Sequence, residues 1–259
     1  MYARRGMWHS SRSNPAPPAA SRVGDALRVY AIGDIHGRRD LLIELLALIS
    51  EDADQFDDTR LVRLVFLGDY IDRGDDAAGV LSALRQLSED AGAGVVFLRG
   101  NHEDALLAFL QDPKERQEWL EFGARQTLAS YGIELPRRGV RSADLVAIRD
   151  ALFAALGPEI GFLASMHTHA RFGDVIFTHA GGNPGPGAFM EDVASMIWGH
   201  PDGLVDAPLP GHLIVHGHYD APDPVVCAGR ICVDTGAYYT GRLTALRLDA
   251  GVGFLSAGG

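Results

Sequence analysis

The chain has 259 residues, a net charge of −11 and 47% hydrophobic residues, which is typical of a soluble globular domain with a large core. No apolar run approaches the roughly 20 residues that cross a bilayer, so the composition excludes a membrane-spanning protein. The acidic balance also argues against a general nucleic-acid surface, because phosphate backbones are bound by clustered Lys and Arg.

The N-terminal segment and the cysteines suggest where the chain folds and works. Residues 1–26 are rich in Arg, Ser, Pro and Ala, so we predict a disordered arm followed by one domain over residues 27–259. No apolar stretch follows Arg4 and Arg5, which does not support a secretory signal. Only Cys227 and Cys232 occur, and we expect no disulfide and a reducing, cytoplasmic setting.

The first half of the domain alternates between strand and helix patterns. We expect strands over 27–32, 61–67 and 95–98, with helices over 39–50, over 76–87 and from 103 onward. Asp34, Asp69 and Asn101 each follow one of these strands. Their spacing suits two successive βαβ units, in which ligands collect at the carboxyl ends of the strands.

The second half has a different pattern. Residues 114–164 are expected to be mostly helical and to form a cap-like insertion beside the site. Short strands are then expected over 175–178, 213–215, 230–233 and 244–248. They lack long helices between them, so we predict an antiparallel or mixed second sheet and an α/β fold class.

The loop after the first strand offers a carboxylate and an imidazole. Asp34 and His36 are separated by one residue, and Gly33 and Gly37 allow tight backbone turns around them. This pattern favours a metal site over an incidental turn.

The second loop carries Asp69, Asp72 and Arg73. One carboxylate can bridge two cations, whereas a second one nearby needs another role. Arg73 presents a planar fork suited to phosphate, although an ordinary surface ion pair between Asp72 and Arg73 is the alternative. Asp75 and Asp76 are expected to cap the next helix.

The third loop places Asn101 beside His102. The Asn101 amide can give a neutral oxygen to a cation, and His102 can act as a general acid if a carboxylate such as Asp72 orients it. A simple helix cap is the alternative for this pair.

Two later strands end in histidine, namely His179 and His218, and together with the three loops they favour a metal centre. His216 could lie behind a ligand and orient it. His167 and His169 are better explained by an exposed edge strand than by metal binding, because no acidic partner stands at a suitable spacing.

In this order, the segments resemble the calcineurin-like metallophosphoesterases, and more narrowly the bacterial form of the phosphoprotein phosphatase branch. The motifs that carry the resemblance are Asp34-x-His36, Asp69-x-x-Asp72-Arg73, Asn101-His102-Glu103, residues 119–132 and Asp234-Thr235-Gly236. The resemblance implies a two-sheet β-sandwich flanked by helices, in an α/β/β/α arrangement whose βαβαβ core carries the metal loops.

It also implies a centre of two divalent metal ions, most often manganese or iron, with zinc as a further option. The first ion would be held by Asp34, His36 and Asp69, and the second by Asp69, Asn101, His179 and His218. A hydroxide bridging the ions would attack phosphorus directly, and mixed nitrogen and oxygen ligands suit such metals. His102, oriented by Asp72, would protonate the leaving oxygen, and Arg73 would hold the phosphoryl group. Asn101, His102 and Tyr219 would also face the substrate.

Two positions depart from the family pattern. Family members often carry an arginine just after the tryptophan corresponding to Trp198, where this chain has His200. Arg99, Arg125 or Arg242 could replace it. After His218, Tyr219-Asp220 replaces a common Thr-Pro, so Tyr219 either faces the substrate or packs against neighbours.

The leading hypothesis is therefore hydrolysis of phosphomonoesters, with protein phosphoserine or phosphothreonine as the first choice of substrate. The runner-up is hydrolysis of symmetrical dinucleoside tetraphosphates. A catalytically silent metal- or phosphate-binding module is disfavoured, because every motif residue is present. The acidic balance disfavours a nucleic-acid phosphodiesterase, and we expect neither nucleic acid nor membrane as a partner.

Overall fold

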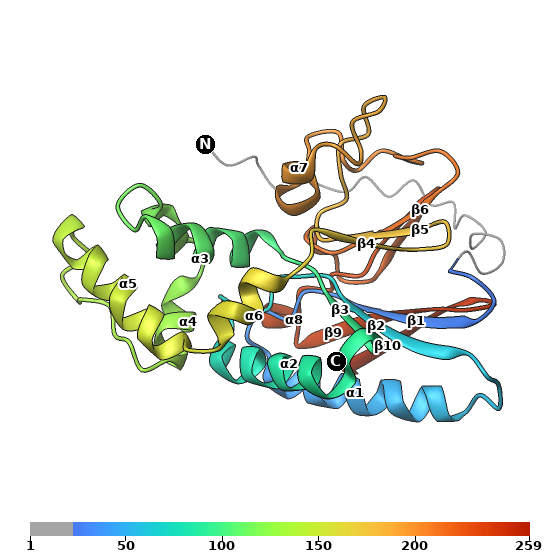
Figure 1. Cartoon of the computed structure of the whole chain (residues 1–259), viewed down its shortest axis with the longest axis horizontal. Coiled ribbons are helices and arrows are strands. Elements are labelled where there is room, and N and C mark those ends of the chain that lie inside the picture. Colours follow the sequence, from blue (N-terminus) through green and yellow to red (C-terminus); the bar gives the residue numbers. More distant parts are fainter. Residues whose placement is uncertain (1–22) are drawn as a thin grey trace.

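Two five-stranded sheets pack face to face in the computed structural model, which describes residues 23–259 (Figure 1). The strand order is β10–β9–β1–β2–β3 in the first sheet and β4–β5–β6–β8–β7 in the second. The first sheet contains β1 (Leu27–Ile32), β2 (Leu61–Phe66), β3 (Val95–Phe97), β9 (Arg242–Leu248) and β10 (Val252–Gly258). The second contains β4 (His169–Phe172), β5 (Val175–Thr178), β6 (Leu213–His216), β7 (Val225–Cys227) and β8 (Arg230–Cys232).

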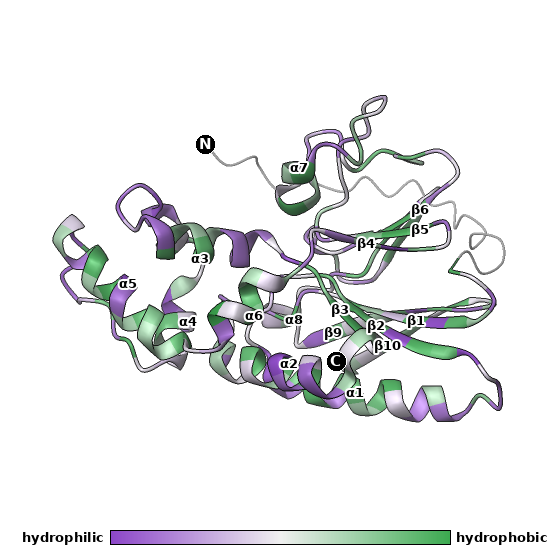
Figure 2. Cartoon of the chain, in the orientation of Figure 1, coloured by the Kyte–Doolittle hydropathy of each residue, from purple (hydrophilic) through white to green (hydrophobic). Residues whose placement is uncertain are grey.

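The two predicted βαβ units are present. β1, β2 and β3 are parallel neighbours connected by α1 (Arg39–Asp54) and α2 (Ala77–Ala91). Along β1, Tyr30 and Ile32 face these helices, whereas Val29 and Ala31 face the second sheet. Figure 2 shows β5 and β6 mostly in green, whereas β4 and parts of β1 and β9 are purple, and α1 and α2 alternate green and purple. This two-sided burial fixes the register of the strands that carry the site loops.

The helix starts follow local chemistry. The Asp76 side chain accepts a hydrogen bond from the Gly79 amide at 2.8 Å, which confirms Asp76 as the cap of α2. α3 (Asn101–Gln111) begins two residues before the expected start at 103. Asn101 is therefore the first helical residue rather than the cap.

One strand was assigned to the wrong sheet. We expected residues 244–248 to belong to the second sheet, but β9 runs antiparallel beside β1, with Val29 opposite Leu248. A buried apolar pattern identifies a strand without naming its partner. The rest of the prediction holds, because the second sheet is mixed: β5, β6 and β8 are parallel, and β4 and β7 are antiparallel edges.

The helical segment lies to one side of the sandwich, next to α3 (Figure 1). It contains a 3₁₀ turn over Gln117–Glu121, α4 (Ala124–Ser130), α5 (Ser142–Leu156) and α6 (Glu159–Ser165), as the expected mostly helical stretch required. On the outer face of the second sheet, α7 (Val193–Trp198) covers Ile176 and Ile214. The short α8 (Ala237–Thr240) precedes β9.

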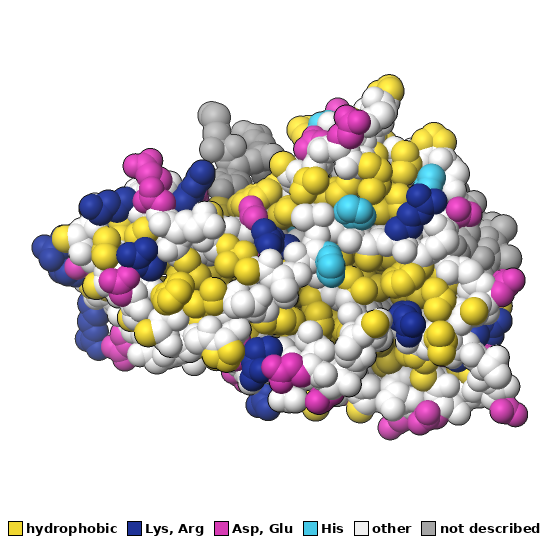
Figure 3. Space-filling view, viewed as in Figure 1, with side chains coloured by type: hydrophobic (Ala, Val, Ile, Leu, Met, Phe, Trp, Pro, Cys, Tyr) yellow, Lys and Arg dark blue, Asp and Glu magenta, His cyan; other side chains and the backbone are white. Residues whose placement is uncertain are grey.

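Three further expectations concern the start of the chain, membrane crossing and surface charge. We predicted a disordered arm over residues 1–26, and residues 1–22 of it lie outside the described residues. Val23 is described, and it is buried with the apolar side chains between the sheets. Within the described part, no helix combines the length and apolar character that crossing a membrane requires. Figure 3 shows basic side chains scattered over one face rather than gathered in a stripe.

Candidate metal centre

Five loops from both sheets meet at the carboxyl ends of their strands. Asp34 follows β1, Asp69 follows β2 and Asn101 follows β3. From the second sheet, His179 follows β5 and His218 follows β6. The structure therefore brings together residues that lie up to 184 positions apart, as the sequence predicted.

Asp69 lies between two groups of histidines. Its Oδ2 is 3.5 Å from His36 Nε2 and 3.8 Å from His102 Nε2. Its Oδ1 is 3.4 Å from His179 Nε2. Burial alone would raise the pKa of Asp69, but His179, His102 and His36 lower it below its usual range. Asp69 is thus an ionised carboxylate whose two oxygens face different neighbours.

Backbone carbonyls hold the Nδ1 atoms of two site imidazoles, so that Nε2 of each faces the centre. His36 Nδ1 lies 2.8 Å from the Ile71 carbonyl, and His179 Nδ1 lies 2.9 Å from the Leu67 carbonyl. A carbonyl can only accept, so in the neutral rings Nδ1 carries the proton and Nε2 keeps its lone pair. Burial lowers the pKa of both side chains, which favours these neutral rings.

The second group contains His179, His218 and Asn101. His179 Nε2 is 3.2 Å from His218 Nδ1, and each nitrogen is 3.0 Å from Asn101 Oδ1. Burial, with the neighbouring His179, lowers the pKa of His218 to about 3. The donor atoms of His36, Asp69 and His102, and those of Asp69, His179 and His218, each lie within 4.8 Å of one another. This donor set fits two adjacent divalent cations.

Asp34 stands slightly apart from both groups. Its carboxylate accepts the His218 backbone amide, at 3.1 Å from Oδ2, and lies against the carboxyl of Asp234. Burial and the charges of Asp234 and Asp69 raise the pKa of Asp34 well above its usual value. Burial raises the pKa of Asp234 to about 7. Asp234 belongs to one of the family motifs, but its contact with Asp34 was not predicted from the sequence.

The backbone of the site is strained. Among the described non-glycine residues, six have a positive φ, and five of them are His36, Asp69, Asp72, Arg73 and His218. This left-handed region is costly for residues with a side chain, and such strain gathers at functional sites.

His102 is oriented by Asp72, as predicted. Its Nδ1 lies 2.7 Å from Asp72 Oδ2, which also accepts the Trp119 indole at 3.0 Å. Thr127 donates to Asp72 Oδ1 at 2.6 Å. Burial lowers the pKa of His102, but Asp69 and Asp72 outweigh it and raise the pKa above its usual value. The Asp72 carboxylate therefore bonds to His102 and to two side chains of the helical segment over residues 114–164, and it forms no ion pair with Arg73.

Glu103 is a buried residue whose part sequence reasoning missed. Its Oε1 accepts the Tyr70 and Ile71 amides at 2.8 and 3.3 Å, and its Oε2 accepts the Asp69 and Gly100 amides, each at 2.9 Å. It therefore holds the strained second loop to the start of α3. A Glu three residues after Gly100, where a capping box places one, was the available signal.

Arg73 and Tyr219 border the centre. Arg73 is exposed, and its Nη1 is 3.1 Å from His36 Nε2. The Tyr219 ring packs edge-on against His218 with centroids 4.8 Å apart, and its hydroxyl points to the His200 carbonyl at 3.5 Å. Tyr219 thus supports a site histidine.

The three candidate replacements for the second arginine lie on the surface. Arg99 approaches Asp104 at 3.6 Å and Arg242 bonds Asp223 at 2.8 Å. Arg125 is exposed on α4. None has a hydrogen bond or ion pair to the predicted metal-ligand residues among the described contacts.

Three further histidines and both cysteines lie on or beside strands and contact no predicted metal-ligand side chain among the described hydrogen bonds. His169 begins the edge strand β4, as expected, whereas exposed His167 lies outside that strand and pairs with Leu98 in an isolated bridge. His216 is buried with its Nε2 3.4 Å from Arg230 Nη1 and its ring beside Tyr219. Cys227 and Cys232 are free cysteines on the paired strands β7 and β8.

Comparison with known proteins agrees with this fold. The family model for calcineurin-like phosphoesterases matches residues 27–222. The chain belongs to this family and is a metallophosphoesterase, an enzyme that hydrolyses phosphoesters.

Three proteins illustrate the similarity. The asymmetrical bis(5'-nucleosyl)-tetraphosphatase PrpE of Anoxybacillus flavithermus is 31% identical, over 83% of this chain and 88% of that protein. Serine/threonine-protein phosphatase 1 of Salmonella typhimurium is 37% identical over only 30% of this chain and 31% of its own length. The structure of a protein serine/threonine phosphatase from Saccharomyces cerevisiae has a TM-score of 0.57 at 12% identity, covering 94% of this chain and 84% of that one.

Proposed function

We propose that the centre holds two divalent cations, one on the His36 side of Asp69 and one on the side of His179, His218 and Asn101. The observation that carries this proposal is the placement of the two Asp69 oxygens, each facing a different histidine Nε2. Asp34 would complete the first site from the end of β1. Manganese or iron suits this set of imidazole, carboxylate and amide donors.

The bound cations would supply a water molecule of lowered pKa and would neutralise charge on the phosphoryl group. Side chains of the protein would bind the phosphoryl group and protonate the leaving oxygen. Arg73 holds phosphoryl oxygens, because its guanidinium reaches the centre and pairs with no carboxylate among the described residues. His102 stays protonated to a higher pH than an ordinary histidine and gives its Nε2 proton to the leaving oxygen. The water oxygen bonds to phosphorus as the bond to the leaving oxygen breaks.

For the substrate, we favour a dinucleoside tetraphosphate over a phosphoprotein, which reverses the order suggested by the sequence. The supporting finding is that the similarity to a bis(5'-nucleosyl)-tetraphosphatase spans most of both chains, whereas the similarity to a serine/threonine phosphatase spans less than a third of each. Phosphoserine and phosphothreonine proteins are the second candidate, because the identity to the Salmonella phosphatase is higher over that shorter stretch.

A direct competition between substrates tests this choice. Protein loaded with manganese is assayed on diadenosine tetraphosphate, on phosphoserine and phosphothreonine peptides, and on p-nitrophenyl phosphate. We expect kcat/KM for the dinucleotide to exceed that for every peptide by about tenfold or more, equivalent to about 1.4 kcal/mol. A preference for the peptides would support the second candidate. Hydrolysis of none of these substrates would contradict both.

A further inference from the structure

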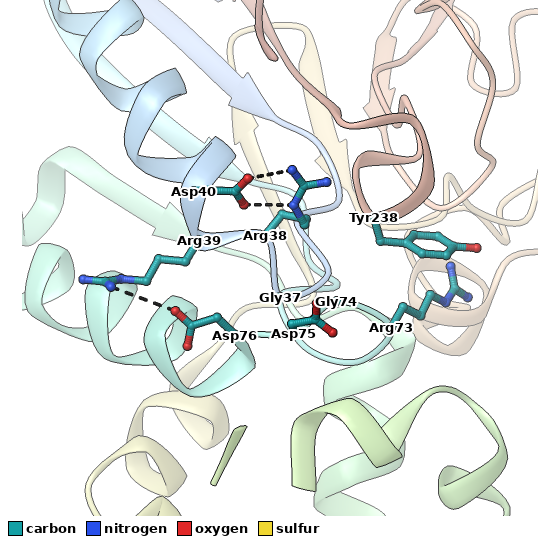
Figure 4. A pocket seen from close by; sticks show the side chains of 9 residues that line it. All are labelled: Gly37, Arg38, Arg39, Asp40, Arg73, Gly74, Asp75, Asp76 and Tyr238. Carbon is teal, nitrogen blue, oxygen red and sulfur yellow. Dashed lines mark hydrogen bonds and ion pairs between the residues drawn. The ribbon is translucent and has the colours of Figure 1, made fainter. Parts of the chain in front are cut away.

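A pocket of about 390 Å³ opens beside the candidate metal centre (Figure 4). It lies between the loop after β1, the loop after β2 and the start of α8. Its lining consists of Gly37, Arg38, Arg39, Asp40, Arg73, Gly74, Asp75, Asp76 and Tyr238. A volume of this size accommodates a small organic group and not a folded partner.

Arg73 and Tyr238 join the pocket to the centre. Arg73 Nη1 is 3.1 Å from His36 Nε2, and the Tyr238 ring is edge-on to the His36 ring with centroids 5.5 Å apart. The Arg73 guanidinium carbon also lies 5.1 Å from the Tyr238 centroid. A group in the pocket would therefore be directly adjacent to a phosphoryl group held by Arg73.

Most of the charges that line the pocket are already paired. Arg38 Nε donates to Asp40 Oδ1 at 2.9 Å and its Nη2 donates to Asp40 Oδ2 at 2.6 Å. Arg39 lies 3.9 Å from Asp76. Figure 4 shows these two pairs apart from Arg73 and Tyr238, which lie beside each other. Without a further free cation, the pocket does not suit another run of phosphates.

Two side chains remain to bind a ligand. Asp75 is exposed and has no hydrogen bond or ion pair to another described residue, so both of its oxygens can accept. Tyr238 is 38% exposed, and the Arg73 guanidinium lies over its ring, so the exposed remainder of the ring is what a ligand can contact. Arg38 Nη1 donates to the Ala237 carbonyl at 2.9 Å, which ties the start of α8 to the loop after β1. A carboxylate acceptor and an aromatic ring that line one pocket suit a ribose diol joined to a flat base.

We propose that this pocket binds one nucleoside of the substrate, with the base against Tyr238 and the ribose hydroxyls on Asp75, while the adjoining phosphate is held by Arg73. This assignment rests on the proposed cleavage of dinucleoside polyphosphates. It makes Tyr238 and Asp75 specificity residues that recognise the nucleoside rather than the reacting phosphorus.

Kinetics with matched substrates test the assignment. Wild type, Tyr238→Ala and Asp75→Asn are compared on diadenosine tetraphosphate, on its 2′-deoxyadenosine counterpart and on inorganic tripolyphosphate, which has no nucleoside. Two controls change similar exposed residues elsewhere: Phe153→Ala on α5 and Asp57→Asn before β2.

We expect Tyr238→Ala to lower kcat/KM for the dinucleotide about tenfold more than for tripolyphosphate. We expect wild type to prefer the ribose over the deoxyribose substrate by about tenfold, and Asp75→Asn to lose that preference. Both control variants should match wild type. Equal losses on all substrates, or an unchanged ribose preference in Asp75→Asn, would overturn the pocket assignment and leave the proposed function intact.

Calorimetric titration with adenosine monophosphate gives a readout that needs no turnover. If wild type fails to cleave the dinucleotide, weaker binding in Tyr238→Ala and Asp75→Asn than in the controls still supports the pocket. No binding to wild type, or equal binding in all variants, overturns it.

Discussion

At the residue scale, burial and the hydrogen-bond partner of each imidazole together set its chemistry. His36 and His179 each use Nδ1 on a backbone carbonyl and have a lowered pKa, which suits a neutral metal ligand. His102 uses Nδ1 on the carboxylate of Asp72 and has a raised pKa, which suits an acid. The same residue type is thus suited to two different roles in one site.

Replacing His102 by Ala separates these roles. We expect turnover of an alkyl phosphate, which needs protonation of its leaving oxygen, to fall about 100-fold or more. Turnover of p-nitrophenyl phosphate, whose leaving group needs no proton, should fall far less. Elemental analysis should show unchanged metal content. Equal losses on both substrates, or loss of metal, would contradict the role of His102 as acid.

His216, two residues before His218, gives a pH prediction for stability. Burial lowers its pKa to about 3, whereas in the unfolded chain it titrates near its ordinary value of about 6.5. Between these values only the unfolded state binds the proton, so this residue reduces stability as pH falls from 6.5 towards 3. It contributes no pH dependence above that window.

His216→Gln removes this titration. The free energy of unfolding of wild type should therefore fall more steeply than that of the variant below pH 6.5, by up to about 1.4 kcal/mol per pH unit. Denaturant unfolding at several pH values measures the two slopes, and only the slopes are compared. Parallel slopes would contradict the neutral, buried state of His216.

At the element scale, the helical segment completes the site from outside the sandwich. Trp119 and Thr127 both bond Asp72, which in turn orients His102. The resemblance singled out residues 119–132, but no pattern in the sequence connected them to Asp72. That contact depends on how the segment folds back, which is a tertiary property.

Removing one hydroxyl tests this support. Thr127 accepts the Asp72 amide at 2.8 Å and donates to Asp72 Oδ1 at 2.6 Å. Thr127→Val should lower stability by about 1–3 kcal/mol and lower kcat about tenfold, with full metal content.

A matched control is Thr178→Val, because the buried Thr178 hydroxyl has no hydrogen-bond partner among the described residues. We expect this variant to be as stable as wild type. Similar losses in both variants would show that Thr127 acts through packing alone.

The accuracy of the element predictions follows the strength of the local patterns. β1 was predicted exactly, and α1 and α2 were found because their apolar residues recur along one buried face. β7 and β10 were not among the predicted strands. β7 is only three residues long and β10 contains Gly253, so neither has a clear alternating pattern. The partner of β9 could not be predicted, because pairing with β1 joins residues about 200 positions apart.

At the scale of the whole molecule, two sheets bring their carboxyl edges to one point. The sequence identified most of the converging side chains, because each ends a strand. It could not identify the pairing of Asp34 with Asp234 or the bonds of Glu103, because these depend on how closely the loops approach. A Cβ on Gly33 would lie 2.6 Å from the Val233 carbonyl oxygen, which shows how tight that approach is.

Gly68 tests the convergence of the loops. A Cβ there would lie 2.6 Å from the Gly100 nitrogen and 2.9 Å from His179 Nδ1. Gly68→Ala should therefore push the second and third loops apart and reduce metal binding. Metal titration measures the loss of affinity, and thermal unfolding measures the loss of stability that accompanies the displaced loops.

Gly132→Ala is the matched control, because Gly132 also has a positive φ but no atom lies within 4 Å of the added Cβ. It should lose about 1 kcal/mol of stability through backbone strain, and keep its metal affinity. Equal metal affinity in the two variants would contradict the close approach at Gly68.

The most direct measurement of the central claim is anomalous scattering from crystals of the manganese-loaded protein. We expect two peaks on either side of the Asp69 carboxylate, one beside His36 and one beside His179 and His218. In Asp69→Asn crystals, at least one peak should disappear. A single peak in the wild type, or peaks remote from Asp69, would contradict a two-cation centre organised by this residue.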